Sequence, residues 1–213
     1  GEGSVEEQGF KIVAAHTDSP TFRIKPSPEM KVKNYMKLNT EAYGGPILYT
    51  WLDRPLSVAG RVVLRNDDPL HPKRRLVDLH EPIVIIPSLA IHMNRKVNEG
   101  LGLNKQKDTL PLLGIVEEAL DKEKRILDLL ARNLGVETKE IIDFDLFLYP
   151  VEKGCIMGMN KEFISSPRLD DLAMVHSGLK AIIQRKPKSG INVLVCFDNE
   201  EVGSSTKQGA ASP

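Results

Sequence analysis

The chain has 213 residues, a length that suits one large domain or two small ones with real cores. Its composition is 41% hydrophobic, and its 29 lysines and arginines balance 29 aspartates and glutamates. Because the net charge is zero and no apolar run could cross a bilayer, we expect no nucleic-acid or membrane partner. The two cysteines lack metal-type spacing, which is typical of a soluble protein in the reducing cytoplasm.

The first predicted strand is Phe10–Ala15, and it ends on the polar run His16-Thr17-Asp18-Ser19-Pro20. On an extended chain His16 and Asp18 point to one face, so Asp18 can hold the second ring nitrogen of a metal-binding His16. For this pattern alone, a hydrogen-bonded turn before Pro20 is the simpler interpretation. The preceding residues, Gly1–Gly9, contain neither an initiator Met nor a signal peptide, as expected for a fragment.

A β-rich module is predicted from about Lys25, because short alternating segments there are separated by proline and glycine turns. The expected strands are Lys31–Tyr43, Ile47–Leu52, Leu56–Arg65, Leu76–Leu79 and Ile83–Ile86. The basic cluster Lys73-Arg74-Arg75 is most simply a solvated loop. We interpret the module as an insertion into an α/β domain.

The second part of the insertion carries a histidine and an amphipathic helix. His92 lies among apolar neighbours, which by default indicates a partly buried core or interface residue. The helix is predicted over Lys122–Leu134, and its buried stripe consists of Ile126, Leu127, Leu130 and Leu134. A helical turn is expected at Thr138–Ile142 and a strand at Asp145–Tyr149.

Another helix is predicted to begin at Ser166-Pro167, because proline suits the first helical position, and to continue to Arg185. Asp170 and Asp171 then fall in its first turn, where the helix dipole favours an ionised carboxylate. Such an aspartate either stabilises the helix or binds a metal. The first explanation is the simpler one for an aspartate seen alone.

The last apolar run, Ile191–Phe197, predicts a strand buried on both faces of a parallel sheet, with Cys196 inside it. It is followed by the acidic residues Asp198, Glu200 and Glu201. Ligands of open α/β sheets bind beyond the carboxyl ends of the strands, where these residues lie. Adjacent carboxylates repel unless a cation, a shared proton or different surroundings separate them. A solvated acidic turn is the simpler alternative for this stretch alone.

The combination of these patterns favours a metal site. A histidine after one strand, an aspartate at a helix start and a glutamate pair after another strand are ligands that zinc accepts. Two metals about 3.5–4 Å apart can share a bridging carboxylate and a bridging water, and a further glutamate can take the water's proton. Glu200 and Glu201 fit this division, with one bound to metal and one free as general base.

The same blocks resemble the signatures of the aspartyl aminopeptidase family of dinuclear zinc metallopeptidases. They are His16–Pro20, Ser166-Pro167-Arg168-Leu169-Asp170-Asp171-Leu172 and Asp198–Ser204, in this order. Three segments of the insertion resemble further landmarks of the family: Tyr43-Gly44-Gly45, Trp51–Leu56 and Leu89–His92. The resemblance covers nearly the whole chain.

The resemblance implies a role for each matching residue. His16 would bind one zinc and be oriented by Asp18, Asp170 would bridge two zinc ions, and Glu201 would bind the second. Glu200 would deprotonate a zinc-bridged water, which attacks the first peptide bond. Other divalent metals are conceivable in place of zinc. The family supplies a further Asp and His, expected beyond residue 213.

The resemblance also predicts the organisation and the partners. An α/β zinc-peptidase-like catalytic domain, present only in part, would comprise residues 1–25 and a truncated 163–213, and residues 26–162 would form an inserted β-rich dimerisation domain. His92 would reach the partner subunit's site. Family members form homo-oligomers, often dodecamers, and remove single N-terminal residues from peptides. One departure is Asp171, where relatives often carry Asn.

Two alternatives remain open at this point. The chain could be a noncatalytic assembly subunit that uses the insertion, in which case it would hold no stoichiometric zinc. It could also belong to another dinuclear zinc exopeptidase family with the same strand-end ligands. Peptides with free and blocked amino termini distinguish the second alternative from an aminopeptidase.

Overall fold

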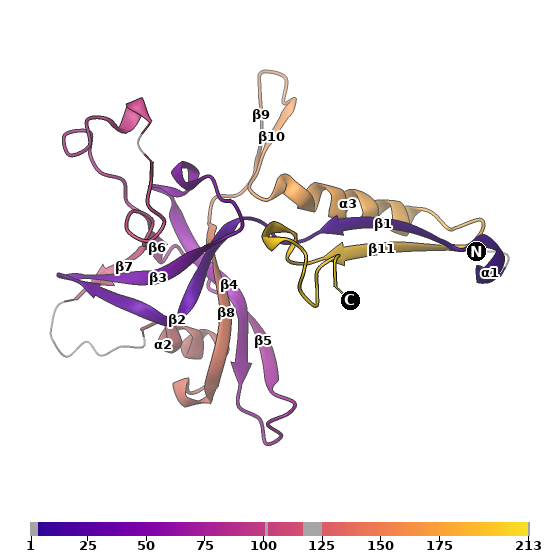
Figure 1. Ribbon diagram of the computed structural model, residues 1–213, viewed down its shortest axis with the longest axis horizontal. Helices are drawn as coiled ribbons and strands as arrows, with labels where there is room; N and C mark the ends of the chain where they lie inside the picture. Colours follow the sequence, from indigo (N-terminus) through magenta and orange to yellow (C-terminus); the bar gives the residue numbers. More distant parts are fainter. Residues whose placement is uncertain (1–3, 101, 117–124, 213) are drawn as a thin grey trace. The chain divides into compact units, whose positions relative to one another are not determined.

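The computed structural model describes residues 4–100, 102–116 and 125–212. The chain divides into two compact units, one of Gly1–Pro20 with Lys153–Pro213 and the other of Thr21–Glu152 (Figure 1). The predicted divisions, after residues 25 and 162, differ from these. The first four residues after Pro20 already pair within the second unit, from Thr21 opposite Tyr43 to Ile24 opposite Thr40.

The first unit is α/β, as the sequence predicts. Strands β1 (Phe10–His16) and β11 (Ile191–Phe197) run parallel, with Phe10 opposite Ile191 and His16 opposite Phe197. Helix α3 (Leu169–Gln184) packs against both strands (Figure 1). The unit also contains the short helix α1 (Val5–Gln8), the hairpin strands β9 (Cys155–Met157) and β10 (Phe163–Ser165), and the 3₁₀ helix η4 (Glu200–Val202).

Helix α3 approaches the strand pair closely because of one glycine. A Cβ on Gly178 would lie 2.7 Å from Leu194 Cδ1 and 3.5 Å from Val13 Cγ1. A larger residue there would push the helix away from the strands, so Gly178 sets the separation of helix and sheet.

The prediction that Ile191–Phe197 is buried on both faces is wrong for the described chain. Cys196 is exposed, and no residue of β11 is fully buried. On the neighbouring strand, Ile12 and Val13 are also exposed. Helix α3 packs against the pair, but the described residues bury neither strand on both faces.

The second unit is built on a seven-stranded sheet with the order β5-β4-β6-β7-β3-β2-β8. Strand β8 pairs antiparallel with both β2 and β4, which closes the ring of strands and leaves β5 outside it on β4. The bounds are β2 Thr21–Val32, β3 Tyr35–Tyr43, β4 Pro55–Leu64, β5 Lys73–Asp78, β6 Val84–Ile85, β7 Leu112–Ile115 and β8 Ile141–Pro150. The β-rich insertion predicted from the sequence is confirmed.

The core of this unit lies inside the ring of strands and beneath helix α2 (Arg125–Leu134). Its largest fully buried side chains include Phe22, Leu38, Leu56, Ile86, Ile126, Leu130, Leu146 and Leu148. Phe22 meets Trp51 edge to face, with ring centroids 5.2 Å apart. Of the predicted helical stripe, Leu127 is only partly buried, and Ala131 is buried in addition. The predicted helix residues Lys122–Lys124 lie outside the described residues.

Several local predictions in this unit need correction. The predicted strand Lys31–Tyr43 is the end of β2 and all of β3, because Lys33 turns the chain at a φ of 55°. Ile47–Leu52 contains the 3₁₀ helix η1 (Leu48–Trp51), whose turn is closed by a bond from the Thr50 hydroxyl to the Ile47 carbonyl. The expected loop Lys73-Arg74-Arg75 begins the outer strand β5, where charged side chains remain solvated.

The remaining connections are the 3₁₀ helices η2 (Val97–Glu99) and η3 (Thr138–Glu140), the latter within the helical turn predicted there. None of the helices in the described ranges is long and apolar enough to cross a membrane.

Candidate metal centre

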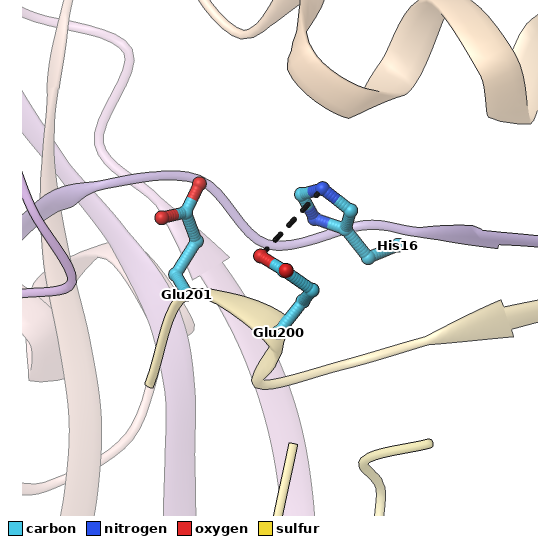
Figure 2. Close-up of side chains that lie close together, drawn as sticks. All are labelled: His16, Glu200 and Glu201. Atoms are coloured by element: carbon cyan, nitrogen blue, oxygen red, sulfur yellow. Dashed lines mark ion pairs between the residues drawn. The ribbon is translucent and has the colours of Figure 1, made fainter. Parts of the chain in front are cut away.

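The end of the parallel strand pair brings His16 and the glutamate pair together. His16 is the last residue of β1 and lies opposite Phe197, the last residue of β11. Glu200 and Glu201 follow in η4, so they lie at the same edge. Figure 2 shows the three side chains close together. One ligand atom from each residue lies within 4.8 Å of the others. The dashed line in Figure 2 marks the pair His16 Nε2 and Glu200 Oε2, and these two atoms lie 3.9 Å apart.

Asp170 approaches the same histidine from the start of α3. Its Oδ1 lies 3.2 Å from His16 Nε2, and its side chain is 88% exposed. The predicted ligands His16, Asp170 and Glu201 and the predicted base Glu200 therefore occupy one region. In this arrangement Glu200 is as close to His16 as a ligand would be, so the geometry alone does not separate its role from that of Glu201.

Asp18 contacts both His16 and the glutamate pair. Its side chain is only 7% exposed, and its Oδ1 lies 3.3 Å from His16 Nδ1. The two carboxylate oxygens also accept the backbone N–H groups of Glu200 at 3.2 Å and Glu201 at 3.1 Å. The sequence predicts the contact with the imidazole but gives no sign of the bonds to the glutamate backbone.

The charges around His16 and Glu201 favour the binding of a cation. Burial lowers the pKa of His16, but the charge of Glu200 and the bond to Asp18 outweigh it, and the net pKa is raised. Burial raises the pKa of Glu201, and the charges of Glu200 and Asp18 raise it further. The negative charges of Glu200 and Asp18 contribute to both shifts, and a divalent cation would neutralise this charge.

The donor atoms fit zinc. Both ring nitrogens of His16 face carboxylate oxygens, which only the protonated ring can satisfy as a double donor. A metal on Nε2 would replace that proton and leave Nδ1–H bound to Asp18, the arrangement common among metal-binding histidines. One imidazole and several carboxylates form a donor set that zinc accepts.

The start of α3 differs from the prediction. The helix is assigned from Leu169, with Arg168 as its N-cap, and Asp170 and Asp171 have non-helical backbone angles. The two aspartates thus precede the regular helix instead of forming its first turn. Two hydrogen bonds join them to the end of β1 and the residues after it: the His16 N–H donates to Asp171 Oδ2 at 3.2 Å, and the Ser19 hydroxyl donates to the Asp170 carbonyl at 3.3 Å.

His92 lies in the other unit, in a turn of the loop between β6 and η2, and its side chain is exposed. His92 is therefore not a core residue of the described chain, and the alternative that it is an interface residue stays a prediction. The loop begins at Ser88, whose N–H and hydroxyl both donate to the carboxylate of Asp53, at 2.8 and 2.5 Å.

Known proteins resemble the chain over its whole length. Residues 1–213 match a sequence model of the family described as aminopeptidase I zinc metalloprotease (M18). A probable M18 family aminopeptidase 2 of Clostridium novyi (strain NT) is 60% identical over 213 residues, covering 100% of this chain and 49% of the relative. The chain thus spans about half the length of the curated relatives that it matches.

Solved structures share the fold. The structure of mApe1 from Chaetomium thermophilum superposes with a TM-score of 0.83 at 30% identity, covering 95% of this chain and 48% of that one. The mApe1 dodecamer from S. cerevisiae gives a TM-score of 0.74 at 32% identity, covering 96% and 47%.

Proposed function

We propose, because this chain belongs to the M18 family of aminopeptidase I zinc metalloproteases, that the protein is a zinc-dependent aminopeptidase. Its reaction is the hydrolysis of the first peptide bond of a substrate with a free N-terminus. The observation that carries the proposal is the convergence of His16, Glu200 and Glu201, with Asp170 beside them.

Three side chains are assigned to the metal in this proposal. His16 and Glu201 would each hold zinc, and Asp170, whose exposed carboxylate has two oxygens, would supply a third ligand side chain. Zinc bound there would supply Lewis acidity, which lowers the pKa of a water and polarises the carbonyl of the scissile bond. Asp18 holds the Nδ1 side of the His16 ring and thereby leaves Nε2 for the metal.

Glu200 is assigned as the general base. Its side chain is 55% exposed, so a water and a peptide can reach its carboxylate, whereas Glu201 is partly buried. The Glu200 carboxylate takes a proton from the attacking water and returns it to the nitrogen of the leaving peptide. The bond between Asp18 and the Glu200 N–H keeps the backbone of the base in place.

The proposal also includes an oligomeric assembly and a cellular location for the protein. Since mApe1 of S. cerevisiae was solved as a dodecamer, we assign the unit Thr21–Glu152 to dimerisation within a homo-oligomer. The exposed side chain of His92 is available to contact a partner subunit's site. The thiols of Cys155 and Cys196 are both free, which fits the cytoplasm.

The test uses the full-length protein and two matched peptides, one with a free and one with an acetylated N-terminus. We expect release of the first residue from the free peptide only, loss of this activity on chelation, and recovery on adding zinc. A full-length protein that contains no bound zinc and cleaves neither peptide would instead support a noncatalytic assembly subunit. Cleavage of the acetylated peptide would indicate another type of exopeptidase.

A further inference from the structure

Asp171 has no part in the ligand set or the proton transfer, yet its carboxylate contacts the metal-site strand. Its Oδ2 accepts the backbone N–H of His16, a residue 155 positions earlier in the chain. The neighbouring carbonyl of Asp170 accepts the hydroxyl of Ser19. These two bonds join the segment that carries one assigned ligand to the strand end that carries another.

The direction of the His16 N–H explains why β1 needs this acceptor. Successive backbone N–H groups of a strand point to opposite edges, and the next one, of Thr17, donates to the Phe197 carbonyl of β11 at 2.9 Å. The His16 N–H therefore points away from β11. Buried or partly buried N–H groups need a partner, and at this position the carboxylate of Asp171 supplies it.

Helix stabilisation does not account for Asp171. An acidic residue at a helix start usually interacts with the free N–H groups of the first turn. Here Asp171 has φ −116° and ψ 20°, outside the helical region. Its carboxylate oxygen is bonded to β1 instead.

We propose that Asp171 is a positioning residue, which fixes the backbone of His16 relative to Asp170 so that both present their donor atoms to one metal site. This inference rests on the proposed function. Asp18 controls the rotation of the His16 ring, and Asp171 controls the main chain from which the ring projects. Together they hold His16 Nε2 3.2 Å from Asp170 Oδ1.

The test compares Asp171→Ala with Asp171→Asn in the full-length protein. Alanine removes the acceptor, whereas asparagine keeps one oxygen at the same place and removes only the charge. Loss of a group that orients a metal ligand typically costs about 10–100-fold in metal affinity or activity. We expect such a loss of zinc affinity and of kcat for Asp171→Ala, and recovery of both in Asp171→Asn. The exposed Glu6, changed to Ala, is the control for a lost negative charge.

Each outcome decides the proposal. Wild-type zinc affinity in Asp171→Ala would overturn it, and so would an equal defect in Asp171→Asn, since the charge and not the bond would then matter. If Asp171→Ala melts early, Asp171→Ser, whose hydroxyl is too short to reach the His16 N–H, replaces it and must show the same loss of zinc affinity. An inactive wild type that still binds zinc would contradict the proposed function. The zinc affinities of the variants would even then test the positioning role of Asp171.

Discussion

At the scale of single residues, Asp18 connects the parts of the candidate site. Its carboxylate reaches the His16 ring and the backbone of both glutamates, although the three partners come from opposite ends of the chain. A side chain with two acceptor oxygens is required, because Glu200 N–H and Glu201 N–H bond to different oxygens.

Replacing Asp18 by Asn should therefore lower activity even though the size is unchanged. The amide offers one acceptor oxygen, so one glutamate N–H loses its partner. We expect kcat of the full-length protein to fall by about 10–100-fold, as for other groups that orient metal ligands. Steady-state kinetics with Asp128→Asn as control measures this, and an unchanged kcat would contradict the role of Asp18.

Changing Glu200 to Gln separates proton transfer from metal binding. The amide cannot accept the proton of the attacking water, so kcat should fall by about 10²–10⁴-fold, the usual contribution of a general base. Zinc content should stay at the wild-type value, because Glu200 is not assigned as a ligand. Metal analysis and turnover of the same sample test both statements, and loss of zinc would make Glu200 a ligand.

The convergence of the site could be predicted from sequence only in part. His16 and Glu201 follow parallel strands, whose carboxyl ends meet at one edge, so their meeting follows from the strand pattern. The roles of Asp170 and His92 came from the family resemblance. The bond between Asp171 and the His16 N–H could not be predicted from the sequence. It depends on the non-helical backbone angles of Asp170 and Asp171, whereas the sequence pattern predicts a regular helix there.

At the scale of elements, the helix–strand contact of the first unit depends on Gly178. Gly178→Val should destabilise the full-length protein by about 1–3 kcal/mol, because the added atoms overlap Leu194. Urea unfolding measures the effect, and Ser177→Ala, an exposed position in the same turn, is the control. Equal stability of the two variants would show that α3 can shift without cost.

The Asp53–Ser88 contact anchors the loop that carries His92, and it predicts a pH effect. The two bonds from Ser88 hold the pKa of Asp53 below its ordinary value of 3.8. The contact thus stabilises the fold above pH 3.8, and this contribution is lost as the pH falls through the lower folded-state pKa.

Removing the hydroxyl tests this contact. Because Asp53 is exposed to solvent, Ser88→Ala should cost at most about 1 kcal/mol at neutral pH, and the difference from wild type should shrink at acid pH. Urea unfolding of both proteins at pH 7 and near pH 3 measures it. A difference that grows on acidification would contradict the assignment.

The elements themselves were predictable where the pattern was long and regular. The alternation of Leu56–Arg65 and the helical stripe of Ile126–Leu134 match β4 and α2. Short strands such as β7, β9 and β10 were missed, since three or four residues carry no measurable periodicity. The strand at Ile47–Leu52 was predicted wrongly because a local hydroxyl bond stabilises a 3₁₀ turn there.

At the scale of the whole molecule, the proposed dinuclear site needs more ligands than those assigned within the described residues. Each zinc ion usually takes about three protein ligands besides water. The assigned ligands within the described residues are His16, Asp170 and Glu201. The chain also covers only 49% of its Clostridium novyi relative, so we assign the missing ligands to the rest of the full-length protein.

A protein consisting of residues 1–213 alone should therefore bind zinc weakly and be inactive, whereas the full-length protein should bind two zinc ions tightly. Parallel zinc titrations by calorimetry compare them. Tight binding of two ions by the shorter protein would contradict the ligand assignment.

The most direct test of the central claim is anomalous diffraction at the zinc edge from crystals of the full-length protein. The account predicts zinc at a coordination distance of about 2.0–2.2 Å from His16 Nε2 and from carboxylate oxygens of Asp170 and Glu201, with Glu200 beside the ions but unbound. Zinc peaks remote from these three side chains, or none at all in a zinc-loaded active sample, would contradict it.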